Sequence, residues 1–591
     1  MITSEYLKQN IEKFGNEPAL SIKDGTGAWR TDTWNDFYQY VLDISKSLLA
    51  AKIGINEKIS IYSYNRREWY ACYAAAQYIN SVSIGIYHTC SSSEVDWIVS
   101  NSDSKIVFVG NNPSDNGETD KMLNYRILNI LDKLDKIEYV VMMTGVEKLE
   151  HKKIITWDEF IAKGDNTNDS EIKERNDSIT LEATSSLIYT SGTTGNPKGV
   201  ELTYRNWEFE VSRTEYFLKL NQGDRYVSWL PLAHVFGQLV DNHVWIKNAL
   251  HIHVVDNPLA IVDYAKEVKP HFFIGVPRIY EKIYSNLMSA IKSKIILKVG
   301  LKLPILSGLL KKKLKGAIGF SNVVFSATGA APINPDILKL FHFLDIPLFE
   351  GYGMTENTAV ATTNHYKNNK IGTVGKPLPE TEIKLSEEDE ILLKGQHIMK
   401  GYYNNEEATN KSIIDGWLYT GDIGSIDSDG FLSIIGRKKE IYVNSGGKNI
   451  APLVIEETMK SISILSQCFL IGDARKYCSA LFTLDVGAIL RDKVGMDTHK
   501  ISKDPTEQLK QMKENGYSLS DFTENEDIKF EIQSNVDELN RQFSNPEQIK
   551  KFSILPRDFS IDHSELTPTL KIRRKQINKN WSDIIESMYV D

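Results

Sequence analysis

The sequence predicts an α/β protein, because strand patterns and helical patterns alternate along most of the chain. Short runs rich in Val, Ile and Tyr have the composition of strands, and a helical stretch, REWYACYAAAQYIN at residues 67–80, follows the first of them. Strands that alternate with helices are typical of a parallel, doubly wound sheet. The expected strands of this sheet are residues 58–65, 82–89, 105–111 and 138–145.

A second series of strand patterns predicts a second doubly wound sheet. Its expected strands are residues 225–232, 249–256, 271–277, 322–328 and 347–353. From about Ile371 the sequence pattern changes. In residues 373–395 and 421–436, apolar and polar residues alternate with a period of two and turn residues separate the alternating runs. This pattern predicts antiparallel strands.

Composition is that of a globular enzyme. The 591 residues are 41% hydrophobic and 25% charged, which suits a soluble chain of about three or four domain-sized units. The net charge of -9 argues against bulk nucleic-acid binding. The four cysteines show no zinc-binding spacing, and we expect neither a signal peptide nor a transmembrane helix. These features predict a cytoplasmic protein with reduced thiols.

One loop has the composition of a phosphate-binding segment. The stretch IYTSGTTGNPKGVELTYRN, residues 188–206, places glycines and hydroxyl residues around Lys198. Such loops expose backbone N–H groups and hydroxyls, which are the donors that hold phosphates. The P-loop pattern of NTPases does not fit, because Pro197 precedes the lysine and Gly199 follows it. Taken alone, the loop is equally compatible with a flexible turn between a strand and a helix.

Five further stretches supply the other groups that binding and activating ATP needs. Tyr352 offers an aromatic surface for adenine, Asp422 a carboxylate for a ribose diol, and Glu356 a carboxylate for Mg²⁺. Lys571 provides a cation for charge that develops on phosphorus. The stretches are ATGAAPINPD (327–336), EGYGMTEN (350–357), WLYTGDIG (417–424), GRKKEIYVNSGGKN (436–449) and SELTPTLKIRRKQI (564–577).

The content and order of these motifs resemble the AMP-forming acyl-CoA synthetases. These enzymes belong to the adenylate-forming superfamily, which also contains luciferases and peptide-synthetase adenylation domains. Within it, four stretches look most like long-chain fatty acyl-CoA synthetases. They are SWLPLAHVFGQ (228–238), GVPRIYEKI (275–283), IGDARKYCSALFTLD (471–485) and ILPRDFSIDHSELTPTLKIRR (554–574).

The resemblance implies a role for each motif residue. The β- and γ-phosphates of ATP would be held by Thr190, Ser191, Gly192, Thr193, Thr194, Gly195 and Lys198. Adenine would be lined by Gly329, Ala330, Ala331, Pro332, Tyr352 and Gly353. The remaining roles are Asp422 and Arg437 at the ribose, Thr355 at the α-phosphate, Glu356 and Thr190 at Mg²⁺, and His234 near the carboxylate. Lys571 would catalyse adenylation, Lys439 would be a hinge, and Gly446 and Gly447 would approach pantetheine.

The resemblance also implies the architecture and the reaction. A large N-terminal domain, residues 1–438, would contain the two doubly wound sheets and a small β-barrel-like subdomain. Residues 439–591 would form a smaller, mobile α/β domain. The implied reaction joins a long-chain fatty acid to coenzyme A through acyl-AMP, with ATP and Mg²⁺. Two alternatives are a ligase that transfers the acyl group to a carrier protein, and a sensor that binds acyl groups and nucleotides without turnover.

The segment from Ile291 to Gly316 is rich in lysine and has no acidic residue. Apolar residues alternate with eight lysines at partly helical spacing, and Pro304 interrupts the pattern. Two interpretations remain open. The segment is either a basic amphipathic element in peripheral contact with an anionic membrane or a helical hairpin that packs on its own domain.

Overall fold

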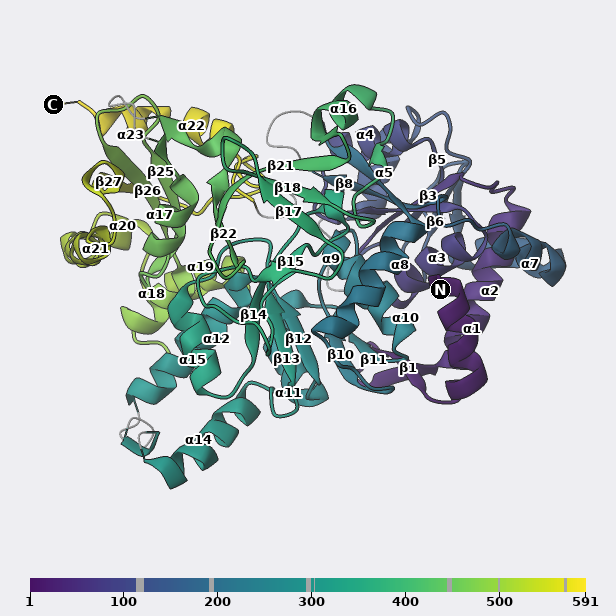
Figure 1. Cartoon of the computed structure of the whole chain (residues 1–591), viewed down its shortest axis with the longest axis horizontal. Coiled ribbons are helices and arrows are strands. Elements are labelled where there is room, and N and C mark those ends of the chain that lie inside the picture. The colour runs from purple at the N-terminus through teal and green to yellow at the C-terminus, as the bar shows by residue number, and fades with distance from the viewer. Residues whose placement is uncertain are drawn as a thin grey trace.

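The computed structural model describes residues 1–112, 122–190, 196–293, 299–301, 303–443, 449–497, 500–567 and 571–590. Figure 1 shows a large body that contains the N-terminal and central parts of the chain, and a smaller body formed by the C-terminal part. This arrangement agrees with the expected α/β fold.

The largest sheet has eight strands in the order β19-β9-β8-β4-β3-β5-β6-β7. Six of them, β3 to β8, run parallel to their neighbours, whereas β9 and β19 are added antiparallel at one edge. All four strands expected between residues 58 and 145 are therefore confirmed. The strands are β3 (Lys58–Ser63), β4 (Val82–Ile86), β5 (Ser104–Gly110), β6 (Tyr139–Met142), β7 (Ile154–Thr156), β8 (Thr184–Thr190), β9 (Lys198–Thr203) and β19 (Gly401–Tyr402).

The second doubly wound region is built as two hydrogen-bonded sheets. One has the order β10-β11-β1-β2 and the other the order β12-β13-β14-β15-β16. The five expected strands are all present. Strands β1, β2 and β15 were not expected, and β1 inserts between β11 and β2. The strands are β1 (Pro18–Lys23), β2 (Trp29–Thr33), β10 (Arg225–Ser228), β11 (His251–Val254), β12 (Phe272–Gly275), β13 (Phe325–Thr328), β14 (Leu348–Tyr352), β15 (Thr362–Thr363) and β16 (Lys376–Pro377).

Helices cover these sheets and fill the space between them (Figure 1). The best-buried helix is α3, in which every residue after Arg67 is buried because it packs between layers. The helices are α1 (Thr3–Phe14), α2 (Trp34–Ala50), α3 (Arg67–Tyr78), α4 (Ser92–Ser102), α5 (Leu123–Leu131), α6 (Trp157–Ile161), α7 (Asp169–Asp177), α8 (Tyr204–Arg213), α9 (Val235–Gln238), α10 (Trp245–Lys247), α11 (Ile261–Val268), α12 (Pro277–Ser293), α14 (Pro304–Ala317) and α15 (Pro335–Phe343).

The region with period-two alternation forms an antiparallel sheet, as expected. Its order is β17-β18-β21-β20, and β22 pairs with β21. The elements are β17 (Glu382–Leu385), β18 (Glu390–Lys394), α16 (Glu406–Ser412), β20 (Ile413–Ile414), β21 (Trp417–Ile426) and β22 (Leu432–Arg437). This sheet brings the end of β22 beside the end of β14, so it closes one side of the site described below.

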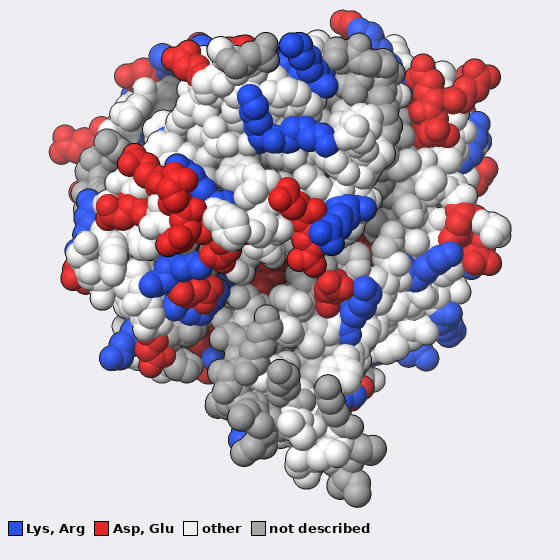
Figure 2. All heavy atoms as spheres, turned by 90° about the vertical axis from the view of Figure 1, so that its left-hand side faces the viewer, with Lys and Arg blue, Asp and Glu red and all other residues white. Residues whose placement is uncertain are grey.

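The C-terminal part has a core of its own around a three-stranded sheet. Strand β26 pairs antiparallel with β25 and parallel with β27. On the face of this part seen in Figure 2, basic and acidic side chains are interspersed rather than separated by sign. The elements are β23 (Tyr442–Val443), β24 (Asn449–Ile450), α17 (Pro452–Met459), β25 (Leu465–Ile471), β26 (Cys478–Leu484), α18 (Val486–Asp492), α19 (Pro505–Glu514), α20 (Ser520–Thr523), α21 (Glu526–Asn540), β27 (Ile549–Ile554), α22 (Arg574–Asn580) and α23 (Ser582–Ser587).

The lysine-rich segment contains a helix that projects from the large body. Helix α14 lies at the lower end of Figure 1, away from the sheets. Its base contacts the body, because Lys311 forms an ion pair with Asp345 at 3.2 Å and Lys315 Nζ donates to the carbonyl of Asp345 at 3.1 Å. Among the described residues, no helix is long and apolar enough to cross a membrane.

An aromatic cluster joins the N-terminal helices to the second sheet region. The indole of Trp245 is fully buried and stacks on Trp34 with a centroid separation of 5.2 Å. The edges of Phe37 and Tyr70 contact the same ring at 4.8 and 5.7 Å. Trp245 Nε1 also donates to the carbonyl of Ala19 in β1 at 3.2 Å. One side chain therefore stabilises three neighbouring elements.

We expect Trp245→Ala to lower the free energy of unfolding of the large body by about 3–5 kcal/mol, because the substitution leaves a large cavity and two unpaired carbonyls. Chemical denaturation followed by tryptophan fluorescence and circular dichroism measures this change. The control is Ile55→Ala, since Ile55 is 49% exposed, and it should cost less than about 0.5 kcal/mol. Equal effects of the two substitutions would contradict the assignment of Trp245 to the core.

Candidate active site

The expected phosphate loop connects two paired strands at the edge of the largest sheet. Thr190 ends β8, Lys198 begins β9, and the two residues are register partners. The Thr190 hydroxyl donates to the carbonyl of Lys198 at 3.5 Å. Ser191, Gly192, Thr193, Thr194 and Gly195 lie outside the described residues. The described ends fix where the loop leaves and re-enters the sheet.

Tyr402 connects Lys198 to Glu356. The Lys198 ammonium lies 3.9 Å from the centroid of the Tyr402 ring, and the Tyr402 hydroxyl donates to Glu356 Oε1 at 2.8 Å. Burial lowers the pKa of Lys198, the Glu356 carboxylate opposes that shift, and Lys439 adds to it. No sequence motif indicates Tyr402, because the pair Gly401–Tyr402 joins the sheet only through long-range pairing with β9.

The turn after β14 is too tight for any residue except glycine at position 353. A Cβ atom on Gly353 would lie 1.9 Å from the carbonyl oxygen of Ala359. Thr355 and Glu356 follow on a buried 3₁₀ turn, and the Glu356 carbonyl accepts from the amide of Met399 at 2.8 Å. This close packing holds the hydroxyl of Thr355 and the carboxylate of Glu356 at the end of the strand.

The small-residue turn after β13 lies against β14. A Cβ atom on Gly329 would be 3.1 Å from the carbonyl oxygen of Gly351, so the two backbones approach closely. Ala330 has a φ of +68°, in the left-handed region that a tight turn requires. Ala331 and Pro332 complete the turn before α15. The turn expected to line adenine is therefore adjacent to Tyr352, which ends β14.

Asp422 is the most highly connected carboxylate of the site. Tyr352 Oη donates to Asp422 Oδ2 at 2.7 Å, and Arg437 Nε lies 2.9 Å from Asp422 Oδ1. Asp422 and Arg437 are register partners on β21 and β22, so strand pairing itself brings them together. Burial raises the pKa of the Asp422 carboxyl, and the Arg437 guanidinium and the Tyr352 hydroxyl oppose that shift by stabilising its charged form.

His234 is held in a fixed turn before α9. Its Nδ1 accepts a hydrogen bond from the backbone amide of Phe236 at 3.2 Å, so the other ring nitrogen carries the proton of the neutral form. Burial lowers the pKa of His234 to about 4, and Lys571 contributes to the decrease. Asn65 fixes the turn by donating to the carbonyl of Leu230 at 2.8 Å. Asn65 belongs to none of the sequence motifs described above.

Lys571 comes from the C-terminal part and faces the same group of residues. Lys571 is an exposed residue. Surrounding protein atoms and the Arg437 guanidinium lower its pKa, whereas the carboxylates of Asp422 and Glu356 oppose that shift. Lys571 also lowers the pKa of His234, as described above. Five of the expected residues therefore lie within electrostatic range of one or more of the others, although they are far apart in the sequence: His234, Glu356, Asp422, Arg437 and Lys571.

The loop that carries Lys571 is closed by its own hydrogen bonds. The amide of Lys571 donates to Thr567 Oγ1 at 3.0 Å, and the amide of Thr567 donates to the carbonyl of Lys571 at 2.8 Å. Arg574 then fixes the start of α22, because its Nη2 forms an ion pair with Glu456 at 2.6 Å. These contacts attach both sides of the loop to the C-terminal core.

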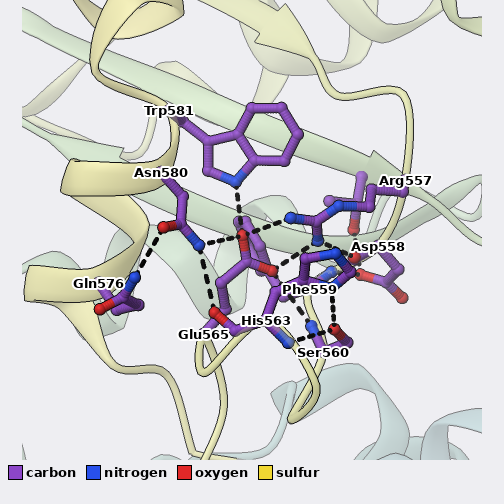
Figure 3. Close-up of polar contacts among 10 residues, drawn as sticks. Arg557, Asp558, Phe559, Ser560, His563, Glu565, Gln576, Asn580 and Trp581 are labelled. Atoms are coloured by element: carbon purple, nitrogen blue, oxygen red, sulfur yellow. Dashed lines mark hydrogen bonds and ion pairs between the residues drawn. The ribbon is translucent and has the colours of Figure 1, made fainter.

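A fully buried carboxylate anchors the base of this loop. Glu565 accepts from the guanidinium of Arg557 at 2.6 and 2.9 Å, from Asn580 Nδ2 at 3.1 Å and from Trp581 Nε1 at 2.9 Å. Figure 3 shows these donors converging on Glu565 from both flanking segments. The hydrogen bonds lower the pKa of Glu565, although desolvation acts in the opposite direction. The carboxylate therefore stays charged inside the loop. The neighbouring Asp558 connects the same loop to β25 and β26. Its Oδ2 accepts a hydrogen bond from the hydroxyl of Ser466 at 2.5 Å, and its Oδ1 accepts one from the hydroxyl of Thr483 at 2.7 Å.

Two expected features contribute less to the described geometry. Lys439 is exposed on the turn Lys438–Glu440, directly after β22, and its side chain forms no hydrogen bond with another described residue. Gly446 and Gly447 lie outside the described residues. Within the described part of the chain, no group of three or more His, Cys, Asp or Glu side chains could hold a metal ion without other ligands.

Comparisons with known proteins identify the family and the fold. Residues 7–403 match a family model described as AMP-binding enzyme. The long-chain-fatty-acid–CoA ligase FadD15 of Mycobacterium bovis is 29% identical and aligns over 95% of this chain and 93% of its own length. The long-chain-fatty-acid–CoA ligase ACSBG2 of Xenopus laevis is 30% identical over 99% of this chain and 83% of its own length.

Two solved structures have the same fold. The anthranilate CoA ligase AuaEII, in complex with anthranoyl-AMP, has a TM-score of 0.72 at 16% identity and aligns over 98% of this chain and 97% of its own. The adenylation domain of a carboxylate reductase from Mycobacterium chelonae has a TM-score of 0.76 at 16% identity, over 100% of this chain and 91% of its own. The fold is that of the adenylate-forming enzymes. The chain belongs to the AMP-binding enzyme family.

We expect Glu565→Gln to make the loop that carries Lys571 more mobile. The amide of glutamine has no charge to pair with Arg557, and its NH₂ group is a donor that would face other hydrogen-bond donors. Glu565 is fully buried and Arg557 is 33% exposed, and loss of the charge of such a buried carboxylate costs about 2–3 kcal/mol. Hydrogen–deuterium exchange of residues 556–581 should become faster, and the C-terminal part should unfold at a lower temperature.

The matched control is Gln576→Ala, which removes only a hydrogen bond to Asn580 at 2.7 Å. It should change the free energy of unfolding by less than about 0.5 kcal/mol. Exchange in residues 556–581 that is the same for Glu565→Gln and the wild type would show that the loop does not depend on this carboxylate.

Proposed function

We propose that this protein ligates a long-chain fatty acid to coenzyme A, with ATP as the energy source and acyl-AMP as the intermediate. The observation that carries the proposal is that Lys571, from the C-terminal part, lies close enough to Asp422, Arg437 and Glu356 for their charges to shift its pKa. The names of the relatives described above support the same reaction. The products would be acyl-CoA, AMP and pyrophosphate.

ATP would bind across the ends of β14, β21 and β22. The ribose hydroxyls would bind Asp422 and Arg437, and adenine would lie between Tyr352 and the turn from Gly329 to Pro332. The phosphates would extend towards Lys198, with Thr355 at the α-phosphate. The proximity of Glu356 to Lys198 through Tyr402 supports this direction, because it places a cation and a carboxylate at the phosphate end.

The site also suits Mg²⁺ bound with ATP. The carboxylate of Glu356 and the hydroxyl of Thr190 are hard oxygen ligands, and Mg²⁺ usually completes its shell with phosphate oxygens and water. When bound, the metal would neutralise charge on the phosphates. Coenzyme A is expected as the second substrate, with Gly446 and Gly447 near its pantetheine arm.

In the first half-reaction the fatty carboxylate would attack the α-phosphorus and release pyrophosphate. A carboxylate is already a nucleophile, so the protein must align the reactants and stabilise the negative charge that develops on phosphorus. Lys571 would supply the positive charge that stabilises it. His234 would remain neutral at pH 7, because its pKa is about 4, and would act as a hydrogen-bond donor rather than as a cation.

In the second half-reaction the thiol of coenzyme A would attack the carbonyl of acyl-AMP and expel AMP. Lys571 must then be withdrawn, and we propose that residues 439–591 rotate relative to residues 1–438 about Lys439. The exposed position of Lys439 directly after the last strand of the antiparallel sheet supports this boundary. Rotation of a domain about a short hinge is a common way to use one site for two reactions.

The carrier-protein ligase and the non-catalytic sensor remain alternatives. A sensor would not need the full set of charged groups, whereas Glu356, Asp422, Arg437 and Lys571 are all retained and brought together. The relatives named above favour coenzyme A over a carrier protein as the acceptor. Incubation with ATP, palmitate and either coenzyme A or a carrier protein, followed by mass spectrometry, separates the three functions.

We also propose peripheral contact of this cytoplasmic protein with anionic membrane through the segment 291–316. Helix α14 and its approach expose Val299, Leu303 and Leu309, which are 52%, 50% and 66% exposed. Lysines accompany these apolar side chains and no acidic residue occurs in the segment. Apolar residues that insert among headgroups, together with lysines, are typical of an interfacial element.

Lys571→Ala should lower the rate of acyl-AMP formation from ATP and palmitate by about 10²- to 10³-fold, or roughly 3–4 kcal/mol, because one donor to the developing charge is lost. Supplied with synthetic palmitoyl-AMP and coenzyme A, the variant should form palmitoyl-CoA near the wild-type rate. A hinge variant, Lys439→Pro, should show the reverse pattern. Equal loss of both half-reactions in Lys571→Ala would contradict the assigned role.

Binding to vesicles tests the membrane proposal. The protein should co-sediment with phosphatidylglycerol vesicles at low salt and less at high salt, because each lysine near an anionic surface contributes about 1 kcal/mol that salt screens. Leu303→Ser combined with Leu309→Ser should weaken binding, whereas Phe530→Ser, at an exposed apolar position of α21, should not. Equal binding to anionic and neutral phosphatidylcholine vesicles would refute an electrostatic contact.

A further inference from the structure

Three ion pairs join the C-terminal part to the large body among the residues that the structure describes. They are Glu94–Arg573, Arg278–Asp485 and Asp263–Lys503. The last two connect α11 and α12 to the region of α18 and α19, whereas the first involves the segment that carries Lys571. Arg573 is only two residues from the proposed catalytic lysine, so its contact fixes that segment most directly.

Both partners of this ion pair are also held by hydrogen bonds within their own part of the chain. Glu94 Oε2 accepts from the amide and the hydroxyl of Ser91, each at 3.0 Å, which leaves Oε1 directed at Arg573. Arg573 Nη2 donates to Glu94 Oε1 at 3.0 Å. The backbone amide of Arg573 donates to the carbonyl of Glu565 at 2.7 Å. The pair therefore connects the N-terminus of α4 to the anchored base of the Lys571 loop.

The surface around this contact is polar and open. A pocket of about 590 Å³ lies between the two parts of the chain, with Ser92, Tyr125 and Asn129 on one side and Ile561, Asp562 and Ser564 on the other. Apolar packing does not seal the interface at this place. The attachment of the Lys571 segment to α4 consequently depends on the charged contact more than it would at a dry interface.

We propose that Glu94 and Arg573 are positioning residues for acyl-AMP formation. Their ion pair stabilises the arrangement in which Lys571 reaches the site, and it must break when residues 439–591 rotate for the second half-reaction. This inference rests on the proposed function. A contact made in only one of two arrangements shifts the balance between them by its own interaction free energy.

The size of the effect follows from the exposure of the pair. The side chains of Arg573 and Glu94 are 32% and 20% exposed, so the contact is partly screened by water. Its loss should slow formation of palmitoyl-AMP from ATP and palmitate by about two- to fivefold. Formation of palmitoyl-CoA from supplied palmitoyl-AMP should stay unchanged or become faster, because the arrangement that lacks the contact becomes more populated.

A double-mutant cycle tests this inference in the full-length protein. Glu94→Gln keeps an acceptor for Ser91, since glutamine also completes the helix cap, and Arg573→Gln removes the other charge. Each single variant and the double variant should slow the first half-reaction equally. Arg573→Lys should restore most of the rate. The control is Arg475→Ala, which breaks an ion pair with Glu586 inside the C-terminal part and should leave the ratio of the two rates unchanged.

Salt gives a second readout. In the wild type, the rate of palmitoyl-AMP formation divided by the rate of palmitoyl-CoA formation should fall as ionic strength rises, because salt screens the Glu94–Arg573 ion pair. In Glu94→Gln this ratio should vary less, because the ion pair is absent. Independent effects of the two single variants, or equal slowing of both half-reactions, would overturn the positioning role. Failure of the wild type to form palmitoyl-AMP would instead overturn the proposed function, so the two failures are distinguishable.

Discussion

The site is organised by the requirement that a buried carboxylate have a cation or a donor beside it. An ionised carboxylate that loses water without such a partner is strongly destabilised, and it regains a proton instead. Asp422 meets this requirement through Arg437 and Tyr352. The pairing of β21 with β22 places Arg437 beside Asp422. Glu356 meets it through Tyr402 and, at longer range, through Lys198 and Lys571. The charges of the site thus stabilise one another before any substrate is bound.

Two kinds of signal made the fold and the site predictable from sequence. Alternation of strand and helix patterns gave the order of the main strands, because a parallel sheet needs continuous apolar runs separated by helices. The motif residues Thr190, Glu356, Asp422 and Lys571 were identifiable because their stretches match, in content and order, the motifs of the family that the sequence resembles. Their clustering could not be derived from spacing, since it depends on sheets that bring together residues hundreds of positions apart.

Other residues gave no local signal. Tyr402 belongs to a two-residue strand, and its importance arises only when β19 pairs with β9. Glu565 lies in a polar stretch that would ordinarily be exposed, yet its carboxylate is fully buried because Arg557, Asn580 and Trp581 surround it. The division of the second sheet region into two sheets was also invisible, because period and composition identify a strand but not its neighbours.

The position of β1 has a consequence for how the chain acquires its fold during synthesis. Residues 18–23 lie between β2, which follows at once, and β11 at residues 251–254. A hairpin of two strands is marginally stable by itself, so β1 and β2 must wait until more than 200 further residues have left the ribosome. Contacts of such sequence separation form slowly. Until β11 is made, the edge of β1 that pairs with it has no partner, and a product truncated before residue 251 would expose that edge to pairing with other chains.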